Sequence, residues 1–373
     1  MNSLALGVSD DRGNLCLGQP GPWGRLELAP LGITPPPELI EQYQIVLERT
    51  VWTFPTLGQS QVQELLVRCG ILPELAHDLA ARGQAGTEGW QLSPSLRELL
   101  EIPAEPRGKL YHWLGWSNAK SWQACAFRHF GDHFEDWLAG AALAPATIEL
   151  IRPLVYNVGS YLMFADLPAV AGQIGDPAEL RRLIAALARE ATLLMQLHVR
   201  PGDNLEQLIA YWGRGGRVKQ VRPLLESLAK IPRGRAIDVV HLLPDFARRR
   251  VFTFPDWLHD GHDHHRDCHW SSLNFFSATP DDAYLDLNAV ATAVSRDWRP
   301  SGEPPLLGDL AIFHDEQGHV FHSAVYIAGD ILFTKNGPTP TRPWVLMPLP
   351  QMLRFYHRSS AVSCRYFRRR DLC

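Results

Sequence analysis

A segment near the C-terminus places the strongest constraint on the fold, because three short apolar runs follow one another there with tight turns between them. The runs are residues 310–313, 320–327 and 331–335, and they are separated by the polar turn 315–318 and by a turn near Gly329. Apolar runs of this length joined by such short connections are typical of antiparallel strands paired as hairpins. The segment therefore predicts a three-stranded antiparallel meander.

Upstream of this meander, a cysteine stands where a helix is expected to begin. Cys268 follows Asp267 and heads an apolar stretch, and His322 lies within the second predicted strand. A thiol becomes a strong nucleophile only when its pKa is lowered, and a helix N-terminus and a neighbouring imidazole are two common means. This order makes Cys268 and His322 candidate catalytic residues.

These residues and their surroundings resemble a known family. Asp267-Cys268, then Gly308-Asp309-Leu310, then residues 322–327 look like the signature of the NlpC-type papain-like cysteine peptidases. In that family the three motifs read Asp-Cys-Ser-Gly, Gly-Asp-Leu-Val-Phe and His-Val-Gly-Ile-Tyr. The resemblance implies a papain-like domain over residues 267–373. Members typically cut stem peptides of bacterial cell walls, and relatives on the same fold are amidases or acyltransferases.

Two departures from the family pattern bear on the site. His269-Trp270 replaces the small Ser-Gly pair and is expected to lie close to the nucleophile and reshape the cleft. The family's third polar residue, usually a histidine, falls by residue count on Thr334, which is a poor partner for an imidazole. Asn336 is chemically better, because its amide oxygen can accept a hydrogen bond from the imidazole N–H.

The length of the second turn decides which residue shares a face with His322, because side chains alternate along a strand. A three-residue loop, 328–330, places His322 opposite Asn336. A two-residue loop, 329–330, would place Lys335 on the face of His322, where a lysine would oppose imidazolium formation. We expect the longer loop and therefore a Cys268, His322 and Asn336 site, with Thr334 and Lys335 as alternatives to Asn336.

The expected function is a cysteine hydrolase that cleaves an amide bond without a cofactor. The resemblance implies a peptide or peptidoglycan fragment as the substrate. One alternative is a catalytically inactive protein that binds a peptide or glycan on the same fold. Another is a thioester-forming acyltransferase, in which an acceptor other than water takes the acyl group.

The rest of the chain predicts an α+β protein with a helical N-terminal region and a papain-like domain with a central antiparallel sheet. We expect an extended arm over residues 1–36, a mainly helical domain over 37–240, a connector over 241–266 and the papain-like domain over 267–373. Residues 197–213 partly resemble the opening of the LysM glycan-binding module. An ordinary strand, turn and helix is the favoured interpretation of that segment.

Composition excludes several classes of function. The chain is 46% hydrophobic with a net charge of −4, which indicates a globular core and no general role in binding nucleic acid. No apolar run approaches the length that spans a bilayer. No signal peptide is visible, which fits a cytoplasmic protein or a secreted form whose signal has been removed, so localisation is left open. The oligomeric state is open as well.

Cysteine and histidine spacing gives no metal site. The six cysteines are scattered without a closely spaced pair, which argues against a disulfide scaffold and a structural zinc site. The histidine run within residues 259–265 has the ligand type for zinc, nickel or copper, but adjacent histidines rarely both face one metal. A polar connector without bound metal is expected there. The basic run 368–370 is expected to be a solvated tail.

Overall fold

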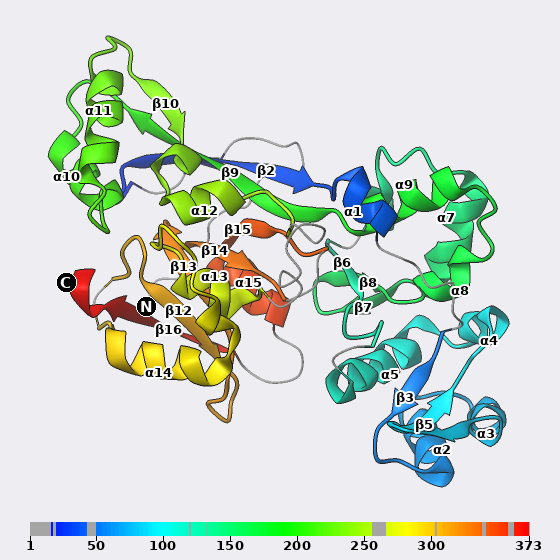
Figure 1. Ribbon diagram of the computed structural model, residues 1–373. Helices are drawn as coiled ribbons and strands as arrows, with labels where there is room; N and C mark the ends of the chain where they lie inside the picture. Colours follow the sequence, from blue (N-terminus) through cyan, green and yellow to red (C-terminus); the bar gives the residue numbers. More distant parts are fainter. Residues whose placement is uncertain are drawn as a thin grey trace. The chain divides into compact units, whose positions relative to one another are not determined.

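The protein is described by a computed structural model, whose contacts divide the chain into two compact units. The first unit comprises Met1–Ile33 and Ala191–Cys373, and the second comprises Thr34–Glu190 (Figure 1). Helices and antiparallel sheets are mixed in the chain, which agrees with the expected α+β class. The structure describes residues 16–17, 20–42, 50–118, 121–131, 133–255, 266–302, 304–337, 341–356 and 362–372.

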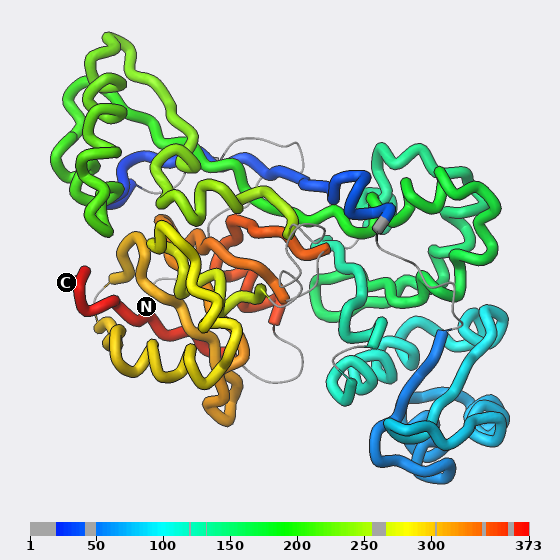
Figure 2. The backbone as a smooth tube through the Cα atoms, in the orientation of Figure 1, coloured from blue at the N-terminus to red at the C-terminus, as the bar shows by residue number. Residues whose placement is uncertain are grey.

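This division differs from the expected one, in which a helical domain of residues 37–240 followed a separate arm. Strand β2 (Arg25–Ile33), from the expected arm, lies beside β9 (Glu190–Val199) in one sheet, as the trace in Figure 2 shows. The sheet order is β1 (Cys16–Leu17), β2, β9 and β10 (Arg235–Asp238). Backbone hydrogen bonds across this sheet tie the arm to residues 190–238, and Leu26 and Leu197 of the sheet share one hydrophobic core with Ile327 of β13 (Val320–Ala328).

The second unit contains more strand than the expected helical domain. It has two three-stranded antiparallel sheets, ordered β3-β5-β4 and β6-β8-β7. Each strand has only three or four residues, too few to show an alternating pattern in the sequence. The strands are β3 (Trp52–Phe54), β4 (Gln84–Gly86), β5 (Gly89–Leu92), β6 (Phe127–Phe130), β7 (Tyr156–Val158) and β8 (Tyr161–Phe164).

Helices α4 (Leu96–Glu101) and α9 (Pro177–Leu187) of the second unit begin at Ser95 and Asp176, whose side chains accept a hydrogen bond from the first turn. Ser95 precedes α4 and accepts a hydrogen bond from the Glu98 N–H, while the Glu98 carboxylate accepts one from the Ser95 N–H, which forms a capping box. The helices are α1 (Pro37–Gln42), α2 (Gln59–Arg68), α3 (Pro73–Ala81), α4 (Leu96–Glu101), α5 (Ala104–Ser117), α6 (Phe134–Leu138), α7 (Pro145–Ile151), η1 (Arg152–Leu154), α8 (Leu167–Ala171) and α9 (Pro177–Leu187).

A buried polar network lies in the core of the second unit. The Tyr111 hydroxyl donates to Asp166 Oδ1 at 2.5 Å, and Arg107 Nε lies 3.9 Å from Asp166 Oδ2. Arg107 also donates to the carbonyl oxygens of Leu99 and Ile102. Burial raises the pKa of Asp166 to about 6, although the Tyr111 hydrogen bond and the Arg107 charge oppose that shift.

The first unit is organised around a six-stranded sheet. Its order is β11-β16-β12-β13-β14-β15, and each neighbouring pair is antiparallel. The predicted meander is confirmed, because β12, β13 and β14 are consecutive neighbours. The strands are β11 (Trp298–Pro300), β12 (Leu310–His314), β13 (Val320–Ala328), β14 (Ile331–Lys335), β15 (Trp344–Pro348) and β16 (Ser363–Arg369).

Helices cover the two faces of this sheet. Leu273 of α13 (Cys268–Leu273) and Val290 of α14 (Leu287–Asp297) pack with Leu310 and Ile312 on one side, which we call the α13 face. Met352 of α15 (Leu349–Tyr356) packs in a separate cluster on the opposite side, which we call the α15 face. The strand residues of that cluster are Ala311, Phe313, Ala324, Tyr326, Leu332, Val345 and Met347.

The turn between β13 and β14 is shorter than expected. Gly329-Asp330 forms a two-residue turn with positive φ angles of 56° and 63°, so the three-residue loop was wrong. A β-bulge lies between Tyr326 and Ala328, however, and beyond it Val325 pairs with Phe333. The extra residue in the bulge restores the register that the longer loop would have produced.

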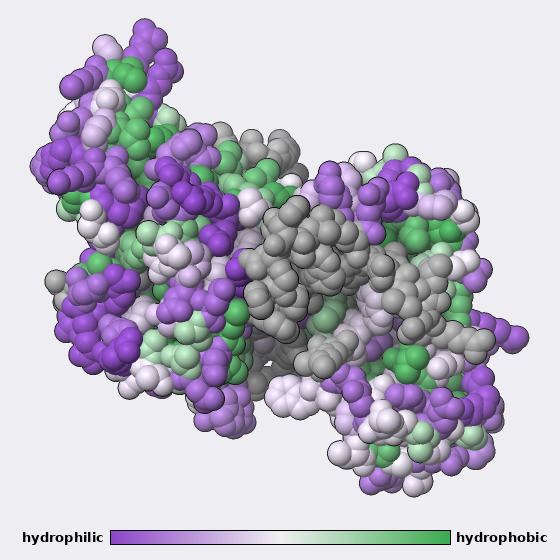
Figure 3. Space-filling view, viewed as in Figure 1, coloured by the Kyte–Doolittle hydropathy of each residue, from purple (hydrophilic) through white to green (hydrophobic). Residues whose placement is uncertain are grey.

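Helices α10, α11, η2 and α12 follow the strands of the smaller sheet, whereas η4 packs beside α13 and α14 and η5 follows β16. After β9, a turn and the Asn204 cap lead into α10, so the segment that partly resembles LysM is a strand, turn and helix. The turn between α11 and β10 carries exposed Lys230 and Arg233 and is hydrophilic in Figure 3. The elements are α10 (Leu205–Trp212), α11 (Val218–Ala229), η2 (Val239–Leu242), α12 (Asp245–Arg250), η4 (Asp282–Leu285) and η5 (Arg370–Leu372).

The C-terminal basic run is not wholly a solvated tail. Arg368 lies in β16 between two other strands and is 6% exposed. Its guanidinium donates to both carboxylate oxygens of Asp309, which is fully buried in the Gly-Asp turn before β12. Pairing in the sheet carries Arg368 to this carboxylate, a long-range contact that the tail's composition does not reveal. None of the helices in the described residues is long and apolar enough to cross a membrane.

Candidate functional site

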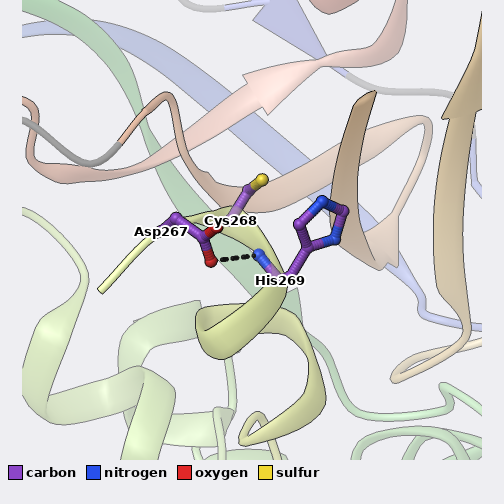
Figure 4. Close-up of side chains that lie close together, drawn as sticks. All are labelled: Asp267, Cys268 and His269. Carbon is purple, nitrogen blue, oxygen red and sulfur yellow. Dashed lines mark hydrogen bonds between the residues drawn. The ribbon is translucent and has the colours of Figure 1, made fainter. Parts of the chain in front are cut away.

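Cys268 is the first residue of α13, as the sequence predicted. Asp267 caps the helix, and its Oδ1 accepts hydrogen bonds from the N–H groups of His269 and Trp270 at 2.9 and 3.0 Å. Cys268 itself is 6% exposed. Figure 4 shows the Asp267, Cys268 and His269 side chains leaving the first turn of the helix. The N-terminal dipole of this turn favours a negative charge on the sulfur.

Three possible ligand atoms meet at this helix start. One donor atom each from Asp267, Cys268 and His269 lie within 4.8 Å of one another (Figure 4). Thiolate, imidazole and carboxylate are all zinc ligands, but three donors fall short of the four that a structural zinc site uses. Asp267 Oδ1 is also engaged in capping the helix. The histidine run 259–265 lies outside the described residues.

His269 is held in place by the sheet. Its Nδ1 lies 2.9 Å from the Ser323 hydroxyl oxygen on β13. Burial lowers the pKa of His269, and the nearby Asp267 charge opposes that shift only in part. Burial therefore favours the neutral ring over the imidazolium form. Trp270 beside it is fully buried, with its indole N–H donating to Asp282 at 2.9 Å.

His322 is buried in a different set of contacts. Its Nε2 lies 3.0 Å from the Thr334 hydroxyl oxygen, and its Nδ1 lies 2.9 Å from the Tyr356 hydroxyl oxygen. The Tyr356 hydroxyl also lies within hydrogen-bonding distance of Asn336 Oδ1, at 3.3 Å. Thr334 is thus the direct partner of His322, while Asn336 is connected to it through Tyr356 of α15.

The sheet separates the two sequence-predicted partners. Ser323, which contacts His269, lies on the α13 face, and alternation places its neighbour His322 on the α15 face. The ring of His322 packs against Phe313 and Tyr356, with centroids 5.4 and 4.4 Å away. Within the part of the chain that the structure describes, no hydrogen bond joins Cys268 to His322.

Lys335 is on the other side of the sheet from His322. It is fully buried, its ammonium donates to the Gly337 carbonyl at 2.5 Å, and its Nζ lies 5.9 Å from the Trp344 ring centroid. The Trp344 indole N–H donates to the Ser271 hydroxyl of α13 at 2.8 Å. Lys335 therefore shares the face of the sheet that α13 covers, and it does not join His322.

Sequence reasoning missed Tyr356 and Ser323, which make the polar contacts of the two imidazoles. A signal for Tyr356 was present, because Met352 and Phe355 have the apolar spacing of one face of a helix. Ser323 carried no signal, since its role depends on which face of β13 meets α13.

The two imidazoles thus lie in separate polar clusters, one on each face of the sheet. The cluster on the α13 face contains Cys268, His269 and Ser323, and the other contains His322 with Thr334 and Tyr356. Comparisons with protein-family models, with curated proteins and with solved structures find no match to this chain.

Proposed function

We propose that the C-terminal part of the first unit is a papain-like cysteine hydrolase that cleaves an amide bond with Cys268 as the nucleophile. The observation that carries the proposal is the meeting of the Cys268 thiol and a His269 ring nitrogen within 4.8 Å at a capped helix start. The helix packs on an antiparallel sheet, which is the arrangement that the resemblance implies.

The contacts favour His269 as the group that takes the thiol proton. Burial favours the neutral form of its ring, which has one nitrogen outside the Ser323 contact. The resemblance assigns this role to His322, but both of its ring nitrogens already lie within hydrogen-bonding distance of a hydroxyl, that of Thr334 or of Tyr356. The Cys268 thiol and the His269 nitrogen need not form a hydrogen bond in the resting state, because such a donor and acceptor can approach each other when substrate binds.

The reaction proceeds in two steps. The Cys268 thiolate attacks the carbonyl carbon, the C–N bond breaks, and the imidazolium returns its proton to the leaving amine. Water then adds to the thioester, which releases the acid and restores the thiol. Asp267 already binds the N–H groups of His269 and Trp270, and no acceptor among the described residues binds the Cys268 N–H, so we assign that N–H to the oxyanion.

One observation favours an inactive binding protein as the second candidate. The His322, Thr334 and Tyr356 contacts satisfy the ring without any contribution from Cys268. A fold that has lost catalysis would keep such a self-contained cluster. The peptide or cell-wall fragment proposed as substrate follows from the sequence resemblance and is common to both candidates.

The alkylation rate of Cys268 against pH, followed by peptide mapping with iodoacetamide, tests the proposal. In the wild type we expect labelling of Cys268 to remain fast well below the usual thiol pKa of about 8.5. Labelling should slow in His269→Ala and stay fast in His322→Ala. Cys364 is an internal control, because burial raises the pKa of its thiol to about 12. Slowing in His322→Ala alone would assign the base to His322. Slow labelling of Cys268 in all three proteins would refute catalysis and favour the binding protein.

A further inference from the structure

Positive charge is concentrated in one stretch of the first unit. Residues 199–238, from the end of β9 through α10 and α11 to β10, contain eight basic and four acidic side chains, whereas the whole chain has a net charge of −4. Two of the acidic side chains, Glu206 and Glu226, are already paired with Arg222. The stretch is therefore locally cationic in an anionic chain, an asymmetry that is typical of a surface for anionic partners.

Four of these basic side chains gather at one end of the smaller sheet, where β9 ends and α11 turns into β10. We call them the basic tip, and they are Arg200, Lys230, Arg233 and Arg235. Arg235 pairs with Val199 across the sheet. Gly234 closes the turn with a φ angle of +70°, and a Cβ atom at Gly234 would lie 3.0 Å from Arg200 Cγ. The turn after α11 thus packs directly against the end of β9, which brings the cations of the two segments together.

The charges of the basic tip are not neutralised within the described part of the chain. All four side chains are exposed, and none makes a hydrogen bond or an ion pair with a described residue. The carboxylate of the adjoining turn, Asp203, accepts a hydrogen bond from the backbone N–H of Arg200 at 2.7 Å. In Figure 1 the turn between α11 and β10 projects at the upper left, away from the six-stranded sheet. Four cations are thus presented together to solvent.

The turn also places apolar side chains between its cations. Ile231 and Pro232 stand between Lys230 and Arg233 in the sequence, and Ile231 is half-buried while Pro232 is exposed. The Gly234 N–H donates to the Ile231 carbonyl at 2.8 Å, which makes the turn tight. An apolar pair flanked by cations at the end of a tight turn suits an interface that is charged at its surface and apolar beneath it.

We propose that the basic tip docks on the surface of an anionic phospholipid bilayer. Each basic side chain near such a surface strengthens binding about fivefold, through attraction to the anionic headgroups. Ile231 and Pro232 enter the headgroup layer while the flanking cations stay at the level of the phosphates. A single-stranded nucleic acid is less suited to the tip, because its bases stack on exposed aromatic rings. The aromatic side chains of residues 199–238, Tyr211 and Trp212, are buried.

Sedimentation of the full chain with vesicles tests the inference. We expect the protein to sediment with phosphatidylcholine vesicles that contain about one third phosphatidylserine, and to stay in solution with phosphatidylcholine alone. The double variant Arg233→Gln with Arg235→Gln should weaken binding about 25-fold, because it removes two of the fivefold contributions. Arg68→Gln with Arg181→Gln is the matched control, since it removes two exposed arginines that lie outside the basic tip and changes the net charge equally.

The outcomes separate a bilayer from other anionic partners. Raised ionic strength should release the bound protein, because salt screens exposed charges. The inference is overturned if both kinds of vesicle bind equally, if neither binds, or if the two double variants weaken binding equally. It is overturned as well if a single-stranded oligonucleotide or polyglutamate binds saturably while the vesicles do not. The basic tip contains no residue of the proposed cysteine site, so Cys268→Ala should sediment as the wild type does, and slow alkylation of Cys268 would refute the hydrolase alone.

Discussion

Replacing Asp309 by alanine should destabilise the first unit strongly, because the carboxylate is the buried partner of Arg368. Arg368 Nε lies 3.1 Å from Oδ1 and its Nη2 lies 2.8 Å from Oδ2, while the Leu306 N–H donates to Oδ2 at 2.9 Å. A third charge, the Arg214 guanidinium, lies 3.7 Å from Oδ1. Asp309 is fully buried, so water cannot replace the lost carboxylate at these donors.

The expected loss of unfolding free energy is about 3–5 kcal/mol. That is the cost of leaving one ion of a buried pair without its partner, since desolvation of the remaining guanidinium is no longer compensated. In the double variant Asp309→Ala with Arg368→Met the Arg368 charge is gone and only the partly exposed Arg214 guanidinium remains beside the site, so we expect a loss smaller than that of Asp309→Ala alone. Such a non-additive result is the signature of direct coupling between the two residues.

Urea unfolding gives the free energies, and hydrogen exchange of peptides from β12 and β16 assigns the loss to the first unit. Asp297→Ala is the matched control, because Asp297 pairs with Arg296 in solvent. Its unfolding free energy should stay close to that of the wild type. The reasoning is refuted if Asp309→Ala is no more damaging than Asp297→Ala, or if the double variant shows the sum of its two single losses.

Three further outcomes are expected. Because the pKa of Asp166 is raised to about 6 in the folded protein and is about 3.9 in an unfolded chain, the native state binds more protons between these values. The unfolding free energy of the second unit should therefore fall by up to about 3 kcal/mol as pH rises from 4 to 6, and Asp166→Asn should flatten the curve in urea titrations across pH. Gly308→Ala should cost roughly 2 kcal/mol or more in the same assay, because φ is +88° and the new Cβ would lie 2.2 Å from a Phe276 ring carbon. Ser95→Ala should cost about 1 kcal/mol through loss of the capping box with Glu98, and an unchanged urea midpoint would contradict that estimate.

The features that sequence could predict are local ones. The meander needs only short apolar runs and turn residues, and the helix start at Cys268 needs only the capping Asp267 before it. The turn between β13 and β14 shows where local reasoning stops. Gly329-Asp330 is a recognisable two-residue turn, but nothing in the chain marks the bulge after Tyr326, because a bulge is defined by the pairing partner.

Other features depend on contacts between distant parts of the chain. Arg368 belongs to a basic run that looks solvated, and its burial follows from the place of β16 between β11 and β12. The same holds for β2, whose partner β9 is more than a hundred residues away in the sequence. In both cases the tertiary fold determines which strand is the hydrogen-bonding partner, and the pattern of one sequence segment does not predict that partner.

Alternation along β13 decides which polar side chain meets α13, the helix that begins at Cys268. Phe313 pairs with His322 and Ile312 pairs with Ser323, and the register shifts only after this point, between Phe313 and His314. A shift by one residue would exchange His322 and Ser323 between the two faces, since strand side chains have a period of two. The observed register gives the α13 face a serine, and His269 from the helix supplies the imidazole beside Cys268. For this reason the motif order alone does not identify the base, and the pH profile of Cys268 alkylation in the two histidine variants does.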